Sequence, residues 1–217
     1  MRLDPSIMTG FGISDDDIQA FTSSNAGLYG IDTSRLSRFL LAQLTSAWKH
    51  KALNTFAVTD VIQRLEGRSP FPSMTAKPRQ FKGDALHGLW KVHFFDARFL
   101  IRNIYNEWSM FSSKSDKFEK LCARVVAEEE EAPSRVGWQG RLAHEFVMEG
   151  YRQRAAKQKL TGEWLIFGVH KQKNIYLSIC THSNSPEQDR EIYGTLFALC
   201  GDEFPDVFTR HSGEKSS

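Results

Sequence analysis

The chain has 217 residues and a mass of 24.8 kDa, which is enough for one large domain or two small ones. Hydrophobic residues make up 41% of it and aromatic residues 12%, so the composition excludes a mainly disordered protein. The 28 lysines and arginines nearly balance the 26 aspartates and glutamates. A net charge of +2 argues against a protein that coats nucleic acid non-specifically, although it allows local basic patches.

The cysteines and the apolar runs indicate a compartment. Cys122, Cys180 and Cys200 are odd in number and widely spaced, which fits neither a disulfide framework nor a structural zinc site. No apolar run of signal-peptide length follows the first residues, and nowhere do eighteen apolar residues follow one another. We therefore expect a soluble cytoplasmic protein with no membrane segment.

The first 68 residues have the pattern of helices. Ser14 is followed by three aspartates, which is typical of a helix start. Asp32 or Thr33 is expected to cap a longer helix whose apolar residues recur at helical spacing. Thr59 is expected to cap a short one.

The rest of the chain mixes strands and helices. From 89 to 95, apolar residues alternate with Lys91 and His93, which predicts a strand. The β-rich runs 163–169 and 174–181 flank a polar turn and predict a hairpin. Helices are expected over 96–112, 115–129, 140–159 and 187–200.

These elements predict an α+β fold, in which a helical N-terminal part precedes a small antiparallel β-sheet packed with several α-helices. The proline-rich stretch 67–80 is the best candidate boundary. It would separate a helical region, 1–68, from an α+β domain, 81–208, unless the two form one continuous domain. Residues 209–217 are expected to be a disordered tail.

Basic residues concentrate in two segments. Residues 76–102 hold six bases against two acids, and residues 141–173 hold seven against three. If the two segments meet on the sheet, they form a positive face suited to phosphates; the alternative is an ordinary surface of mixed charge. The candidate binding residues are Arg98, Arg102, His170, Lys171 and Trp90.

Four of the seven histidines, at 87, 93, 170 and 182, lie on or beside the predicted strands. Imidazoles titrate near neutral pH, so a pair of them can act as general base and general acid. With a carboxylate and a cation they would have the parts for metal-independent cleavage of a phosphodiester. The candidate catalytic residues are His87, His93, His182, Glu163 and Lys91.

Other chemistries lack their motifs. His144-Glu145 matches the first half of HExxH, but Met148 stands where the second histidine should be. Dinucleotide, phosphate-loop and nucleophile-elbow motifs are missing as well. We therefore expect no metal and no cofactor.

The predicted hairpin, from Glu163-Trp164-Leu165-Ile166-Phe167 through Asn174-Ile175-Tyr176-Leu177 to His182, resembles the last strand pair of barnase-type ribonucleases. It also resembles the small terminal sheet of RelE-type toxins. The resemblance covers about twenty residues and implies that a histidine near the last turn, His170 or His182, is the general acid. The glutamate–arginine pair of the barnase type has no aligned counterpart.

Two hypotheses follow. The first is an intracellular, bacterial-type RNA-cleaving protein of toxin or defence character, with RNA as its substrate and an inhibitory protein as its expected partner. The second is a non-enzymatic module that binds a protein or a nucleic acid. Convergence of the four histidines in one pocket would favour the first, and the sequence predicts no oligomeric state.

Overall fold

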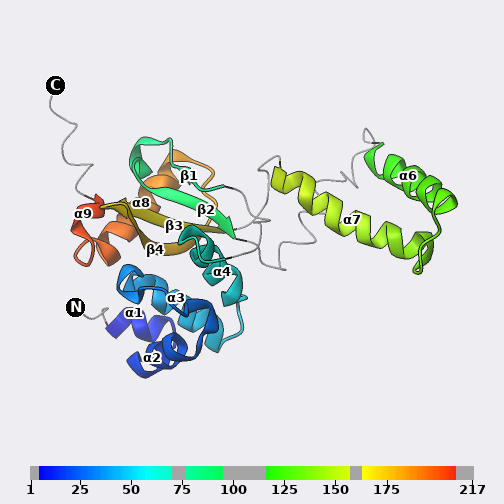
Figure 1. Cartoon of the computed structure of the whole chain (residues 1–217). Coiled ribbons are helices and arrows are strands. Elements are labelled where there is room, and N and C mark those ends of the chain that lie inside the picture. Colours follow the sequence, from blue (N-terminus) through cyan, green and yellow to red (C-terminus); the bar gives the residue numbers. More distant parts are fainter. Residues whose placement is uncertain (1–4, 70–76, 95–115, 157–162, 209–217) are drawn as a thin grey trace. The chain divides into compact units, whose positions relative to one another are not determined.

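A computed structural model describes residues 5–69, 77–94, 116–156 and 163–208. The chain forms two compact units, one of residues 1–95 with 162–217 and the other of residues 96–161. The described residues form eight α-helices and a four-stranded antiparallel sheet (Figure 1), which confirms the predicted α+β class.

The sheet belongs to the first unit, and its strands follow one another in chain order. These are β1 (Arg79–Gln80), β2 (Trp90–Phe94), β3 (Glu163–His170) and β4 (Lys173–Thr181). The predicted hairpin is confirmed as β3–β4, and its tight turn places Lys171 and Gln172 at positive φ. The predicted strand at 89–95 is confirmed as β2, which pairs with β3.

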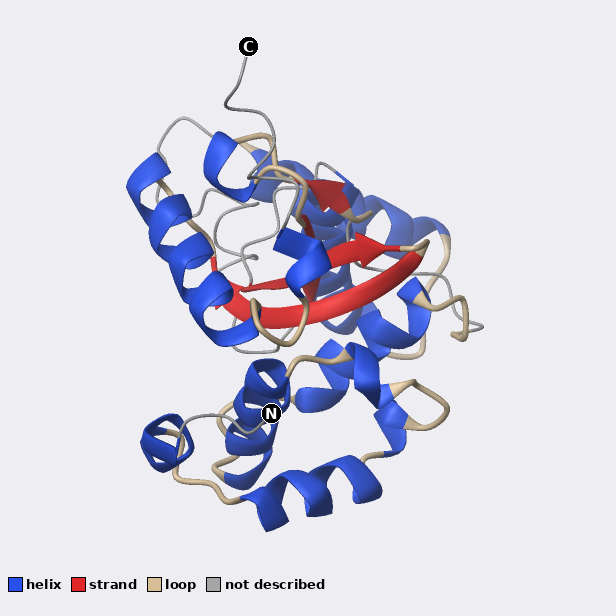
Figure 2. Cartoon of the chain, turned by 90° about the vertical axis from the view of Figure 1, so that its left-hand side faces the viewer, coloured by secondary structure: helices blue, strands red, loops and turns tan. Residues whose placement is uncertain are grey.

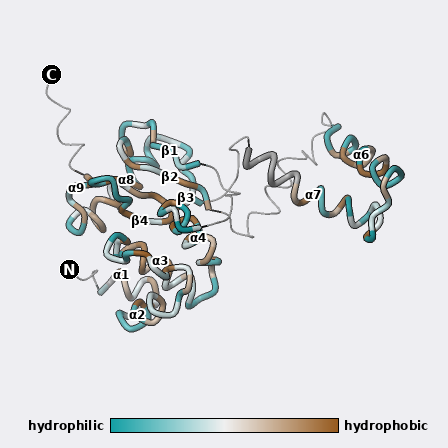
Figure 3. Tube along the Cα trace, in the orientation of Figure 1, coloured by the Kyte–Doolittle hydropathy of each residue, from teal (hydrophilic) through white to brown (hydrophobic). Residues whose placement is uncertain are grey.

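One face of the sheet packs against the N-terminal helices. Alternation places Val92, Leu165 and Tyr176 on this face, where they join one buried cluster. The helices that contribute to the same cluster are α2 (Asp15–Ser24), α3 (Arg38–Lys49) and α4 (Thr55–Leu65). Figure 2 shows the strands among their surrounding helices, and Figure 3 shows hydrophobic residues along the strands.

The opposite face is covered by a short 3-10 helix from the middle of the chain and by two C-terminal helices. Trp164, Ile166 and Leu177 pack there with Leu196 and Phe208. The covering elements are the 3-10 helix η3 (Asp84–Leu86) and the helices α8 (Pro186–Cys200) and α9 (Pro205–Phe208). Because both faces are buried, the strands read as nearly continuous apolar runs.

Helix α3 also covers the outer edge of β4. The Ser37 hydroxyl donates to the Leu177 carbonyl at 2.5 Å and accepts the Leu40 amide, so it joins the edge to the start of the helix. The Gln43 amide group donates to the Ile179 carbonyl and accepts from the Ile179 amide, at 2.9 and 3.0 Å. These side chains satisfy backbone groups that would otherwise be open to pairing with another strand.

The helix starts agree with the sequence only in part. Ser14 caps α2 in a capping box with Asp17, as predicted. Asp32 caps only the 3-10 turn η2 (Thr33–Arg35), and α3 begins after Ser37. Thr59 is wrong as a cap, because Asn54 caps α4 and Thr59 is buried inside that helix. The sequence did not predict α1 (Pro5–Gly10), η1 (Ala26–Leu28), α9 or the two-residue β1.

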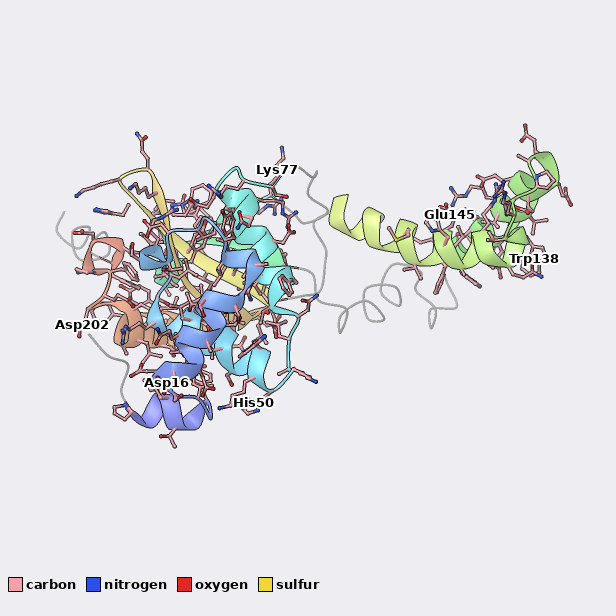
Figure 4. The ribbon with its side chains drawn as sticks, turned by 60° about the horizontal axis from the view of Figure 1, so that its bottom comes forward. Asp16, His50, Lys77, Trp138, Glu145 and Asp202 are labelled. Carbon is pink, nitrogen blue, oxygen red and sulfur yellow. The ribbon has the colours of Figure 1, made fainter. Side chains whose placement is uncertain are left out.

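The second unit contains α6 (Lys117–Glu131) and α7 (Gly137–Ala156). Leu121 and Val125 are buried between them, and the Phe118 and Phe146 rings meet edge to face at 5.5 Å. Helix α7 begins three residues before its predicted start, and Figure 4 labels Trp138 and Glu145 along it. The predicted helix 96–112 and the tail 209–217 lie outside the described residues.

Nowhere in residues 5–69, 77–94, 116–156 and 163–208 is there a helix with the length and apolar character needed to span a membrane.

Gly168 offers a direct test of the packing of α9 on β3. A Cβ atom at Gly168 would lie 2.3 Å from Val207 Cγ1, so Gly168→Ala forces either the Val207 side chain or α9 to shift. We expect the free energy of unfolding to fall by about 1–2 kcal/mol, the usual cost of one extra methyl group in a packed site. Urea unfolding followed by tryptophan fluorescence measures the change.

Two further variants make that test specific. Val207→Ala removes the clashing methyl group and should restore part of the loss in the double variant. Gly194→Ala on α8 is the matched control, because nothing lies within 4 Å of its new Cβ atom. It should raise stability by several tenths of a kcal/mol through helix propensity. An equal loss in the two single glycine variants would contradict the packing.

Candidate functional site

The register of β2 and β3 brings three of the chemically interesting side chains to one face. His93 lies opposite Trp164, and Lys91 lies opposite Ile166 one step further along. Residues with the same parity on a strand share a face, so Lys91, His93 and Trp164 project together towards α8. The sequence predicted that His93 and Lys91 would point the same way, and the structure places them so.

His182 completes the cluster from the segment between β4 and α8. Its Nε2 lies 3.2 Å from Nδ1 of His93, and the two ring centroids are 4.7 Å apart. The other nitrogen of His93, Nε2, accepts a hydrogen bond from the Trp164 indole N–H at 3.3 Å. Trp164, His93 and His182 thus form a short hydrogen-bonded chain.

The donor in this chain determines where the protons are. An indole nitrogen can only donate, so Nε2 of His93 must be unprotonated. A neutral His93 then carries its proton on Nδ1 and donates it to Nε2 of His182. His182 is left with its proton on Nδ1. Both hydrogen bonds exist together only when both imidazoles are neutral.

Lys91 adds a positive charge to the same cluster. Its ammonium nitrogen lies 3.6 Å from the centroid of the Trp164 ring and 4.4 Å from that of Phe81, two cation–π contacts. His182 stacks on Trp164 with ring centroids 4.6 Å apart and planes inclined by 23°. The Trp164 indole is therefore in contact with all the titratable members of the cluster.

The environment favours the neutral forms of these groups. Burial, then the neighbouring His182 and the charges of Lys91 and Arg79, lower the pKa of His93 from 6.5 to about 4. Burial and then Lys91 lower the pKa of His182 as well. Burial lowers the pKa of Lys91, partly offset by Asp189. At neutral pH the two histidines are uncharged beside an ammonium that releases its proton more easily than usual.

The acidic and thiol groups near the cluster have other roles. Asp189, on α8, accepts a hydrogen bond from the Ser183 hydroxyl and so joins the start of α8 to the segment that carries His182. Cys180 lies opposite Trp164 on β4, and burial raises the pKa of its thiol to about 12. A thiol held in that form is a poor nucleophile. Among the described residues, no three His, Cys, Asp or Glu side chains are grouped as metal ligands.

Two of the candidate binding residues lie at the other end of the hairpin. His170 ends β3, where its Nε2 is 3.5 Å from the Asp206 carboxylate, and Lys171 is exposed in the turn. His170 is six steps along the extended strand from Trp164, which is about 20 Å. These two residues therefore do not join the cluster.

The remaining candidates are also apart from the pair. Glu163 precedes Trp164 on β3 and so belongs to the opposite face, as does Trp90, which stacks on Phe167. His87 is exposed at the end of η3, and the described contacts of the pair do not include it. Arg98 and Arg102 lie outside the described residues.

Comparisons of the chain with known proteins found no relative: no protein-family model matches it, and no curated protein or solved structure is significantly similar to it.

Proposed function

We propose that the protein is a cytoplasmic RNA-cleaving enzyme of toxin or defence type, which works without a metal at the His93–His182 pair. The observation that carries the proposal is the direct contact of the two imidazoles at 3.2 Å in one cluster with Lys91. Cleavage of RNA by its own 2′-hydroxyl requires a group that accepts the proton of that hydroxyl and a group that gives a proton to the leaving oxygen, and an imidazole beside an ammonium can supply both.

The proposed step assigns each proton. Nδ1 of His182 takes the proton of the 2′-hydroxyl while the 2′-oxygen bonds to phosphorus. The bond from phosphorus to the 5′-oxygen breaks, and the Lys91 ammonium gives that oxygen a proton. The products are a 2′,3′-cyclic phosphate and a free 5′-hydroxyl. The lowered pKa of Lys91 makes it a better acid than an ordinary lysine.

His93 acts in this step as a positioning residue. For Nδ1 of His182 to accept a proton, the resting proton of that ring must sit on Nε2 and point at Nδ1 of His93. His93 must then carry its own proton on Nε2, towards Trp164. In the resting protein, the hydrogen bonds from Trp164 to His93 and from His93 to His182 place the proton of each ring on Nδ1. Cleavage therefore requires both histidines to change tautomer first.

Binding of RNA phosphates without cleavage is the second candidate function. The resting tautomers favour it, because the Nδ1–H of His182 and the Lys91 ammonium are both donors. Donors of this kind suit the oxygens of a phosphate group. This candidate shares the site and the ligand with the first and lacks only the chemical step.

A cleavage assay tests the proposal. We expect the purified full chain to cleave a labelled RNA oligonucleotide in EDTA at pH 7.5, leaving 5′-hydroxyl and 2′,3′-cyclic phosphate ends. His182→Ala and Lys91→Ala should each lower the rate by about a hundredfold or more, the usual contribution of a general base or acid. His144→Ala is the matched control, because His144 is an exposed histidine on α7, in the second unit.

A second arm separates the two candidates. An oligonucleotide with 2′-deoxyribose at every position cannot be cleaved by this route, so its binding is measured by fluorescence anisotropy. If the deoxyribose oligonucleotide binds in a way that depends on Lys91 and His182, and the RNA is not cleaved, the enzymatic proposal is wrong and the second candidate is supported. Cleavage that survives both substitutions would place the active site elsewhere.

A further inference from the structure

The hydrogen-bonded chain leaves the pair two neutral arrangements. In the first, His93 holds its proton on Nδ1 and His182 on Nδ1, and both observed hydrogen bonds are made. In the second, both protons sit on Nε2. His182 then donates to His93, and the Nε2–H of His93 faces the indole N–H of Trp164. Two donors face each other in that arrangement, so the bond at 3.3 Å is lost.

Trp164 is held firmly enough to impose this choice. Its side chain is 5% exposed and packs edge to face on Phe81 at 5.3 Å. It also pairs with His93 across two hydrogen-bonded strands, so the indole cannot turn away without repacking that face of the sheet. The indole N–H is thus a fixed donor aimed at a single imidazole nitrogen.

We propose that Trp164 is a positioning residue that sets the tautomer of His93, and through it keeps Nδ1 of His182 protonated in the resting protein. The indole N–H opposes the arrangement in which His182 can accept a proton. Its consequence for catalysis rests on the proposed function; its effect on the tautomers does not.

Charged groups around the pair leave the choice between neutral forms to Trp164. Lys91, from β2, acts on both rings with positive charge and opposes a second proton on either, and Arg79, from β1, does the same to His93. On the other strands and helices, Asp189 and Cys180 act on Lys91. His182 contacts Nδ1 of His93 and can either donate to it or accept from it. Among the described contacts, only the Trp164 indole N–H acts on Nε2 of His93, and it can only donate.

Nitrogen-15 NMR of the full-length protein at pH 7.5 tests the proposal, because protonated and unprotonated imidazole nitrogens have well-separated shifts. In the wild type we expect His93 to be protonated on Nδ1 and unprotonated on Nε2, and His182 to be protonated on Nδ1. Trp164→Phe keeps an aromatic ring and removes the N–H. The ratio of Nε2–H to Nδ1–H forms of His93 should then rise about fivefold, as expected for losing one hydrogen bond.

The control is Trp90→Phe, which removes an indole N–H from the opposite face of the sheet and should leave both histidines unchanged. Protonation of His93 on Nε2 in the wild type would overturn the proposal even if Trp164→Phe does not fold. So would identical tautomers in a folded Trp164→Phe. If the tautomers respond as expected and the wild type cleaves no RNA, only the enzymatic function fails.

Discussion

Replacing Glu66 with glutamine is expected to lower the free energy of unfolding by about 2 kcal/mol, less than the usual cost of breaking a fully buried ion pair on one side, because this pair is partly buried. Arg35 donates to the two oxygens of the Glu66 carboxylate at 3.0 and 2.5 Å. The Tyr176 hydroxyl donates to the same carboxylate at 2.6 Å. The Arg35 and Glu66 side chains are only 15% and 14% exposed, so the guanidinium would remain largely out of water with only the more exposed Asp32 carboxylate, 3.6 Å away, to balance its charge.

The stabilising effect of Glu66 should depend on pH. Burial raises the pKa of its carboxyl group, but hydrogen bonds from Arg35, Tyr176 and Asn174 outweigh it and hold the pKa below its ordinary value of 4.5. A depressed carboxyl pKa contributes stability above the unfolded value, and that contribution is lost as the pH falls through the folded value. Urea unfolding at pH 7 and pH 3 should therefore show a smaller difference between wild type and Glu66→Gln at the lower pH.

An exposed ion pair supplies the control. Glu187 pairs with Arg190 on α8 at 2.9 Å, and the two side chains are 67% and 63% exposed. Glu187→Gln should change stability by less than about 0.5 kcal/mol. Arg35→Met and the double variant with Glu66→Gln complete a thermodynamic cycle. Equal effects of Glu66→Gln and Glu187→Gln would mean that the buried pair adds nothing.

The pattern of apolar residues predicted which segments form helices and strands that pack against a core. It predicted the residues at which those elements begin and end poorly. The β-rich runs 163–169 and 174–181 around a polar turn predict the hairpin, because side chains of both parities on these strands enter a core. The start of α4 could not be predicted from Thr59 alone. Asn54 is five residues earlier in a stretch without apolar spacing, and only the folded chain shows that Thr59 is buried. The two residues of β1 are too few for any pattern to mark.

The sequence predicted that histidines and a lysine form the candidate site, but it did not predict which side chains contact one another there. Strand parity predicts that Lys91 and His93 share a face, but the partner of His93 depends on a register set across the residues between β2 and β3. That register brings Trp164 opposite His93. The sequence shows that Trp164 carries an indole N–H donor, but nothing in it marks His93 as the acceptor that this donor reaches. The Arg35–Glu66–Tyr176 network, whose members are 31 and 110 residues apart, gave no sequence signal.

Acid is expected to destabilise the wild type through His93. A histidine whose pKa falls from 6.5 to about 4 on folding binds fewer protons in the folded state than in the unfolded state between those pH values. Stability therefore rises with pH across that window and is lost as the pH falls from 6.5 towards 4. A shift of this size corresponds to about 2 kcal/mol between pH 7.5 and pH 4.5.

The matched comparison is with a side chain that cannot titrate. His93→Gln keeps an acceptor for the Trp164 indole and has no proton to gain, so its stability should fall by about 2 kcal/mol less than that of the wild type over the same interval. Urea unfolding at pH 7.5, 6.0 and 4.5 measures both slopes, and His144→Gln, at an exposed position on α7, should follow the wild type. Parallel curves for wild type and His93→Gln would show that His93 takes up its proton as readily in the folded chain as in the unfolded one. The Trp164–His93–His182 chain requires the opposite, because a proton on Nε2 of His93 breaks its bond to Trp164.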